Sequence, residues 1–464
     1  MAALWSGRFD TEPDRATFEF GASFRFDRRL FEDDVTGSLA WVEALAEAGV
    51  LSGAERTSLS GALATIRDRG RQDPAFVDGP DEDVHTFVER LVVEMAGEAG
   101  KRLHTGRSRN EQVSLDLRLY LRRRLPLLRQ AVVRLAGALV EQAGQAGEAL
   151  MPAYTHLRPA QPILVAHFFL AHAAALRRDD ERLAAAAREA DALPLGSGAV
   201  AGTRYAIDVE ALAARLGFSR VVLNSLDASS DRDFVLSFLH AAAVTMVHLS
   251  RLAEDLIIFC SDEFHFFELS DALSTGSSMM PQKKNPDPLE LVRGKTGRVT
   301  GHLVAMLTAV KGLPSGYNKD LQEDKEAVFD AEDTLAGSLA AMTMVVSQLA
   351  LDRARAERAA SGLLLATDVA DYLVGRGMPF RRAHEVVGAL VRRLVAAGRS
   401  FDSLTLDEWR SASELFDGDI IEHVTPAASV RGKRTPQSTA PEAVAAALAD
   451  LRGWIAGRSA GRTG

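Results

Sequence analysis

The sequence contains five long stretches in which apolar residues recur every three or four positions. They are rich in Ala, Leu and Arg, and the chain shows no convincing run of alternating Val, Ile and Thr bounded by turns. Because an amphipathic helix buries its apolar stripe against another element, several long helices favour an elongated bundle. The sequence therefore predicts a mainly α protein with few strands and with long helices over residues 111–149, 162–188, 232–260, 289–310 and 324–350.

Changes in composition divide the chain into three parts. Up to about Gly106, shorter helical stretches alternate with turns, and beyond about Leu351 the helical stretches shorten again while Gly and Pro return. We expect an N-terminal mixed helical domain over residues 1–106, a central long-helix bundle over 107–360 and a small helical C-terminal domain over 361–464.

The composition also excludes several classes of protein. The 464 residues are 47% hydrophobic and 25% charged, which is ordinary for globular domains. A net charge of -9 disfavours a general nucleic-acid binder, which needs a cationic surface. With Cys260 as the single cysteine, neither an intrachain disulfide nor a cysteine zinc cluster is expected. We find no metal-ligand spacing and no Gly-rich phosphate loop, so the sequence requires no metal and no nucleotide cofactor.

No targeting or membrane segment is recognisable. Arg8 and Asp10 come too early for a secretory apolar segment. The most apolar long window, residues 234–259, is interrupted by Arg251 and Glu254, whereas a membrane span needs about 18 or more apolar residues. We expect a buried helix in this window, no membrane partner and a cytoplasmic protein.

A loop rich in glycine, serine and proline combines mobile donors with fixed cations. Residues 276–286 read GSSMMPQKKNP, so Gly276 and Ser277 lie in a flexible half, and the prolines stiffen the half that carries Lys283 and Asn285. Such a loop can close over a small anion. Ser277 has no adjacent base and no nucleophile elbow, which disfavours an acyl-enzyme hydrolase; the alternative interpretation is a flexible surface turn.

A helix start carries a second candidate site. Residues 104–112 read HTGRSRNEQ, in which Ser108 and Glu111 have capping spacing and Arg109 and Asn110 lie at the first helical turn. Backbone amides at a helix start already attract anions, so this segment suits a carboxylate. The alternative is a capped helix whose arginines are solvated.

A histidine precedes another helix in a segment that cannot be helical throughout. Thr155 and His156 are followed by Pro159 and Pro162, and each proline favours extended backbone before it. A histidine on such a loop can be a base, an acid or a hydrogen-bonded core residue.

Together with residues 311–325, which read KGLPSGYNKDLQEDK, these segments resemble the argininosuccinate lyase family of the fumarase/aspartase superfamily, which includes the delta-crystallins. The resemblance covers nearly the whole chain, from Leu4 to Glu442. The chain departs from the family pattern at four places besides Glu111, where the family more often has Asp. These departures are Arg204, Ala206, Gln437 and Ser438.

The resemblance implies a three-domain fumarase/aspartase-like fold with a long central helix bundle. It also implies a homotetramer in which three chains build each site, and a cofactor-independent β-elimination of argininosuccinate to L-arginine and fumarate in arginine biosynthesis. The first-choice base is Ser277, with Lys283 and Asn285 meeting the carbanion charge, and His156 would be the acid, oriented by Glu290. The opposite assignment of base and acid is also chemically reasonable, and Glu290 could instead cap the helix at Asp287. The resemblance assigns substrate contacts to Ser23, Arg109, Asn110, Thr155, Arg232, Asn285, Tyr317, Gln322 and Lys325.

Two alternatives stay open. A fumarate-releasing relative such as adenylosuccinate lyase is disfavoured by Gln282, Lys283 and Lys284 and by the Tyr317 to Lys325 segment. An abundant structural protein without activity, like the lens crystallins, is disfavoured because the candidate catalytic residues are all present.

Overall fold

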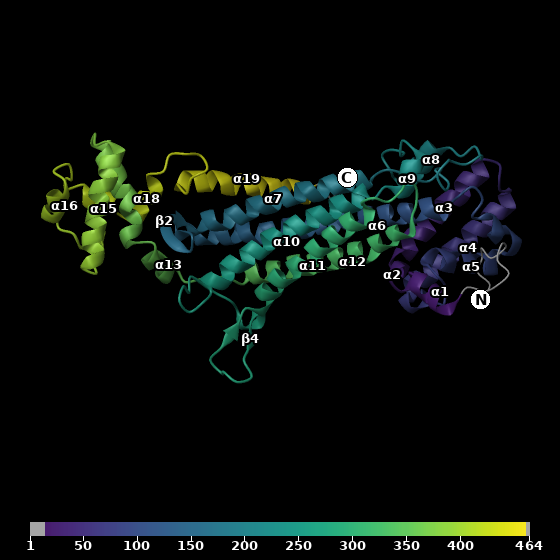
Figure 1. Cartoon of the computed structure of the whole chain (residues 1–464), viewed down its shortest axis with the longest axis horizontal. Helices are drawn as coiled ribbons and strands as arrows, with labels where there is room; N and C mark the ends of the chain where they lie inside the picture. Colours follow the sequence, from purple (N-terminus) through teal and green to yellow (C-terminus); the bar gives the residue numbers. More distant parts are fainter. Residues whose placement is uncertain (1–13, 461–464) are drawn as a thin grey trace. The chain divides into compact units, whose positions relative to one another are not determined.

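A computed structural model describes residues 14–460 of the chain, so Leu4, Arg8 and Asp10 lie outside the described residues. Helices dominate, as predicted, and each of the five long stretches forms one helix whose ends lie within three residues of the predicted ends (Figure 1). They are α6 (Arg109–Ala146), α7 (Val165–Ala190), α10 (Asp233–Phe259), α11 (Asp287–Val310) and α12 (Asp324–Ser347).

Shorter helices make up most of the remaining regular structure. The α-helices are α1 (Arg15–Gly21), α2 (Phe24–Asp27), α3 (Phe31–Glu47), α4 (Gly53–Gln72), α5 (Val84–Ala96), α8 (Val209–Leu216), α9 (Ser225–Ser230), α13 (Arg353–Ala359), α14 (Ala366–Gly375), α15 (Phe380–Ala396), α16 (Leu406–Ala412), α17 (Ile420–His423), α18 (Pro426–Arg431) and α19 (Pro441–Ala460). The 3-10 helices are η1 (Arg28–Leu30), η2 (Pro74–Phe76), η3 (Gly97–Arg102), η4 (Asp271–Leu273), η5 (Lys319–Glu323), η6 (Gly362–Leu365) and η7 (Phe401–Ser403).

Strands are few and pair in antiparallel twos. They are β1 (Leu150–Thr155) with β2 (Arg158–Leu164), β3 (Phe267–Glu268) with β6 (Ala350–Leu351), and β4 (Thr275–Gly276) with β5 (Lys284–Asn285).

The chain divides into two compact units, each built from three stretches of sequence. Among the described residues, the first unit comprises those up to residue 129 together with 181–244 and 297–335, and the second comprises 130–180, 245–296 and those from residue 336 onward. Each of the five long helices has residues in both units. The predicted division into domains at residues 106 and 360 stays a prediction.

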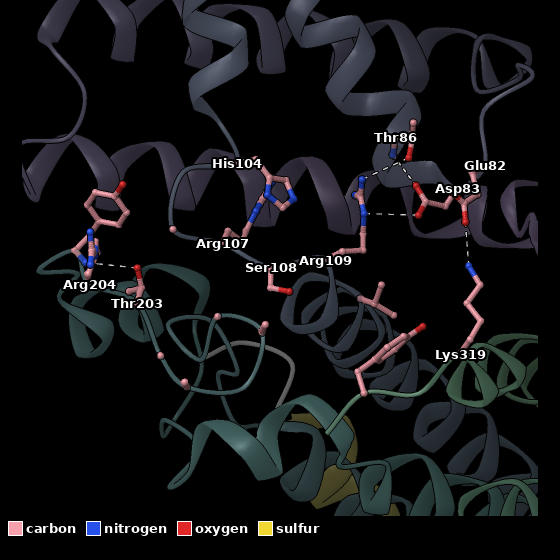
Figure 2. A pocket seen from close by; sticks show the side chains of 18 residues that line it. Glu82, Asp83, Thr86, His104, Arg107, Ser108, Arg109, Thr203, Arg204 and Lys319 are labelled. Carbon is pink, nitrogen blue, oxygen red and sulfur yellow. Dashed lines mark hydrogen bonds and ion pairs between the residues drawn. The ribbon is translucent and has the colours of Figure 1, made fainter. Parts of the chain in front are cut away.

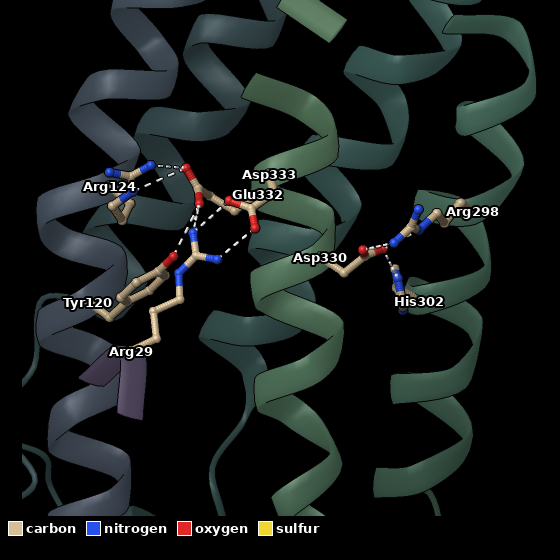
Figure 3. Close-up of polar contacts among 8 residues, drawn as sticks. All are labelled: Arg29, Tyr120, Arg124, Arg298, His302, Asp330, Glu332 and Asp333. Carbon is tan, nitrogen blue, oxygen red and sulfur yellow. Dashed lines mark hydrogen bonds and ion pairs between the residues drawn. The ribbon is translucent and has the colours of Figure 1, made fainter. Parts of the chain in front are cut away.

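A buried carboxylate ties α12 to α6 and η1 in the first unit. Glu332 is 1% exposed and accepts hydrogen bonds from Arg29 and Arg124, each at 2.6 Å, and from the Tyr120 hydroxyl at 3.1 Å (Figure 3). Because a buried carboxylate is costly unless it is paired, these contacts hold the three elements in one arrangement.

A second acidic residue joins α12 to α11 on the other side of the same helix. The Asp330 carboxylate accepts from Arg298 at 2.6 Å and lies 2.5 Å from the His302 imidazole (Figure 3). The pairs are partly exposed, so each contributes less than the buried Glu332 cluster.

Several aromatic side chains of the second unit pack against one another. Phe259, at the end of α10, lies within 5.6 Å ring to ring of Phe168 on α7 and within 5.5 Å of Phe266. A separate apolar cluster packs α14 and α15 against α16 and α17 around Trp409.

The window 234–259, which was predicted as a buried helix, lies in α10. By length and composition, this helix is long and apolar enough to cross a membrane. Its most apolar window is 56% buried, however, and the core helix of a soluble protein passes the same test.

Candidate active site

A cavity of about 1020 Å³ opens in the first unit beside the start of α6 (Figure 2). Its walls come from the residues before and at the start of α5, the segment 104–109, the loop 198–205 and the segment that carries Tyr317 and Lys319. Arg204, one of the departures from the family pattern, lines the cavity on the side away from Arg109 in Figure 2.

The helix start that carries Arg109 is built as the sequence predicts. The Ser108 backbone N–H donates to Glu111 Oε1 at 2.9 Å, and the Asn110 N–H donates to Ser108 Oγ at 3.3 Å. Glu111 is fully buried and its second oxygen accepts from the Gly198 N–H at 3.0 Å. Burial raises the pKa of Glu111 to about 7, although these amides oppose the rise. One carboxylate thus fixes both the helix start and the loop that forms the opposite wall.

The arginines of this segment are not solvated. Arg107 is 7% exposed and donates to Ser38 Oγ at 3.1 Å, and the Arg109 side chain is 21% exposed. Arg109 Nε lies 3.7 Å from the Asp83 carboxylate, as Figure 2 shows. Burial alone would raise the pKa of Asp83, but Arg109 and neighbouring groups lower it to about 2. The interpretation of the arginines as solvated is therefore wrong for Arg107, whereas Arg109 is half-buried and lines the cavity.

Two of the predicted substrate contacts, Arg232 and Lys325, belong to a buried ionic cluster in the first unit. Lys325 Nζ lies 2.9 Å from one oxygen of Asp324, and Arg232 Nε lies 2.6 Å from the other. All three side chains are at most 3% exposed. Arg232 Nη2 is buried and has no hydrogen-bond partner among the described residues.

Of the other predicted contacts in this unit, Tyr317 feels the charge of Asp324, and Gln322 and Ser23 make hydrogen bonds of their own. Burial, followed by the negative charge of Asp324, raises the pKa of Tyr317 to about 12. Gln322 Nε2 donates to the Gly21 carbonyl at 3.1 Å, close in sequence to Ser23, whose hydroxyl donates to Asp27. Asp324 and Lys325, at the end of the segment 311–325, are both buried.

In the second unit, His156 lies at the tip of a two-residue hairpin between β1 and β2. Thr155 pairs with Arg158, and both His156 and Leu157 have positive φ angles, of 56° and 55°. This is the backbone of the tight turn that usually holds Asn and Gly, so a β-hairpin, and not an irregular loop, presents the imidazole. Thr155 and His156 are both exposed.

Ser277 lies in the loop between β4 and β5, and Figure 1 shows this hairpin projecting away from α11. The Met279 and Met280 N–H groups donate to Ser277 Oγ at 3.3 and 3.1 Å. Asn285 lies on β5 and donates to Thr275 at 3.5 Å, and the Lys283 side chain is exposed. The loop amides thus point at the oxygen that would carry negative charge if Ser277 lost its proton.

Glu290 lies in the first turn of α11 and is 52% exposed at its side chain, 3.9 Å from Arg293. Within the described residues, no hydrogen bond or ion pair joins it to His156 or to Asp287. The orientation of His156 by Glu290 stays a prediction. The predicted residues thus fall into two groups: Ser23, Arg109, Asn110, Arg232, Tyr317, Gln322 and Lys325 belong to the first unit, and Thr155, His156, Ser277, Lys283, Asn285 and Glu290 belong to the second.

Asp324 and a buried group formed by Asp34, His85 and Asp116 were not predicted from the sequence as members of the site. The ligand atoms of that group lie within 4.8 Å of one another, which is also a possible metal-ligand geometry. Burial would lower the pKa of His85, but Asp116 and Asp34 raise it to about 10. The protonated imidazole is among the groups that lower the pKa of the buried Asp34, whereas burial raises the pKa of Asp116 well above its ordinary value. No spacing rule reveals this group, since its members come from three separate helices.

Comparisons with known proteins agree with the segments described above. The model of a protein family described as Lyase matches residues 7–301, and the model of a family described as Argininosuccinate lyase C-terminal matches residues 363–431. An argininosuccinate lyase of Moorella thermoacetica is 50% identical over 460 residues, which is 99% of each chain. The chain belongs to the argininosuccinate lyase family. A second member of this family, from Roseiflexus sp., is 49% identical over 457 residues, 97% of this chain and 99% of the relative.

Solved structures agree on the fold. EDDS lyase in complex with formate superposes with a TM-score of 0.84 at 27% identity, over 97% of this chain and 93% of that one. A class II fumarase from Schistosoma mansoni has a TM-score of 0.78 at 15% identity, over 89% of this chain and 93% of that one, and so shows the fold alone. The predictions of a fumarase-like, mainly α fold and of a carbon-nitrogen lyase are confirmed.

Proposed function

We propose that the chain cleaves argininosuccinate reversibly to L-arginine and fumarate in arginine biosynthesis. The observation that carries this proposal is the 50% identity over 99% of both chains with an argininosuccinate lyase. The buried cations described above support it, because the substrate carries carboxylates at both ends. Arg109 lines the cavity, and Arg232 and Lys325 flank Asp324 in the same unit.

The reaction can proceed by proton transfers between side chains and substrate. A base removes a proton from the carbon next to a carboxylate, and the resulting charge spreads into that carboxylate. The C–N bond then breaks, fumarate forms, and an acid protonates the departing guanidino nitrogen of arginine.

Ser277 is our first choice of base. Its Oγ already accepts from the Met279 and Met280 amides, which would stabilise an alkoxide. Lys283 and Asn285 would meet the carbanion charge, and His156, oriented by Glu290, would be the acid. The reverse assignment, with His156 as base and Ser277 as proton donor, is also chemically reasonable.

Incubation with argininosuccinate and, separately, with adenylosuccinate tests the substrate, with fumarate followed by its ultraviolet absorbance. We expect fumarate from argininosuccinate only. Release from adenylosuccinate alone would overturn the proposal, and no release from either substrate would favour a structural protein.

A pair of neighbouring serines tests the role of Ser277. Ser277→Ala should lower kcat by about 100-fold or more, the usual contribution of a positioned acid or base. Ser278→Ala is the matched control in the same exposed loop and should retain near wild-type kcat. Full activity in the Ser277→Ala protein would remove Ser277 from the mechanism.

We also propose a cytoplasmic homotetramer whose sites combine residues from three chains. Exposed apolar side chains on α11 support assembly through this helix: Leu291 is 60% exposed, Val304 57% and Leu307 48%. Gly294 and Gly301 leave open space around α11, so another helix could approach closely.

The mass in solution and subunit mixing test this assembly. Mixing inactive Ser277→Ala and His156→Asn subunits should restore part of the activity, because some sites would then combine intact residues from different chains. A monomeric mass with normal activity would contradict shared sites.

A further inference from the structure

Gln112, in the first turn of α6, connects a buried charged group to Arg109. Its side chain is 2% exposed. Its Nε2 donates to Asp34 Oδ1 at 2.5 Å, and its Oε1 accepts from Arg109 Nη1 at 3.2 Å. The two ends of one amide thus serve two different partners.

The charge state of Asp34 fixes which way this amide faces. His85 Nδ1 lies 2.9 Å from the same Asp34 oxygen and 3.1 Å from Asp116, and all three side chains are at most 1% exposed. An ionised carboxylate only accepts hydrogen bonds, so it must receive the NH₂ group of Gln112. The carbonyl oxygen of Gln112 is therefore forced to face Arg109.

The contact orients Arg109 without adding negative charge. Asp83 and Glu89 lie 3.7 and 3.6 Å from the guanidinium, beyond direct hydrogen-bond distance, and Thr86 Oγ1 lies at 3.4 Å. The neutral amide makes the shortest of these four contacts, and an amide leaves the cation able to attract a carboxylate in the cavity.

We propose that Gln112 is a positioning residue, which transmits the fixed orientation of the Asp34 and His85 pair to Arg109 so that its guanidinium meets a substrate carboxylate. This inference rests on the proposed function, in which Arg109 binds substrate. Gln112 itself does not contact the reacting atoms.

The test compares two variants of similar size. In Gln112→Met both hydrogen bonds are lost, and in Gln112→Glu the donor to Asp34 is lost and an anion is placed beside Arg109. Each should raise the KM for argininosuccinate by about 10-fold, the equivalent of one charge-assisted hydrogen bond, while kcat changes by less than about 3-fold.

Gln142→Met is the matched control on the same helix. Gln142 also uses its amide in the interior, donating to the Val346 and Leu349 carbonyls at 2.8 and 3.1 Å, but it does not line the cavity. The Gln142→Met substitution should lower the thermal midpoint of unfolding without changing the KM for argininosuccinate.

A double variant separates positioning from general damage. In an Arg109→Lys background, Gln112→Met should raise KM no further, because the partner that it orients has been removed. A folded Gln112→Met or Gln112→Glu protein with wild-type KM, or multiplicative effects in the double variant, would overturn the inference. Wild-type turnover of argininosuccinate is measured first, so failure of the proposed function is seen independently.

Discussion

The substitution Asp324→Asn should destabilise the protein strongly although it removes no atom from the core. Asp324 is fully buried and bridges Arg232 at 2.6 Å and Lys325 at 2.9 Å. Asparagine has the same shape but no charge, so two buried cations would lose their shared counter-charge. Breaking a buried ion pair on one side costs about 3–5 kcal/mol. Because asparagine still accepts one hydrogen bond, we expect the loss of unfolding free energy to lie at the low end of this range, at about 3 kcal/mol.

Asp333→Asn provides the matched control on the same helix. Asp333 pairs with Arg29 at 2.6 Å, but its side chain is 60% exposed, and such pairs contribute at most about 1 kcal/mol. Urea unfolding followed by circular dichroism, at one fixed protein concentration because the assembly affects stability, measures both. Equal losses of unfolding free energy in Asp324→Asn and Asp333→Asn would show that burial does not set how much the Asp324 charge stabilises the protein.

The pH dependence of the Asp324 contribution has a defined sign. Burial alone would raise the pKa of Asp324, but Lys325 and Arg232 lower it below the ordinary value of 3.8. A lowered folded-state pKa means that the stabilisation is present above the unfolded pKa and is lost as the pH falls through the folded pKa. The difference between wild type and Asp324→Asn should therefore persist at neutral pH and shrink only in strong acid.

Two further predictions concern His85 and Leu157. The pKa of His85 is raised from 6.5 to about 10, so the stabilisation from its protonated imidazole is complete below pH 6.5 and is lost as the pH rises through 10. The variant His85→Gln should therefore lack the part of the alkaline decline in thermal midpoint that this imidazole causes. An unchanged decline would contradict the prediction. Leu157 is 69% exposed and has a φ of 55°, a backbone conformation that suits glycine. The substitution Leu157→Gly should therefore raise the free energy of unfolding by about 0.5–1 kcal/mol. A lower thermal midpoint in this variant would show that the turn is not strained.

The candidate site could be predicted in part from sequence. The segments with Ser277, His156 and Arg109 were found from residue type and local spacing, and the start of α6 has the predicted contact between Ser108 and Glu111. The hairpin at His156 was expected only as a non-helical connection, because Leu157 carries no turn signal to announce its positive φ. Asp324 was not predicted, since nothing in the local pattern shows that Arg232 packs against it.

The sequence by itself determined the helices and the family. Helical periodicity is a local property, so α6, α7, α10, α11 and α12 lie within three residues of their predicted ends. Only the tertiary structure decided which charges are buried and what compensates them. The Asp34, His85 and Asp116 group and the amide of Gln112 show why: the energy of a charge depends on solvent exclusion and on neighbours within a few ångströms, and both are supplied by residues distant in the chain.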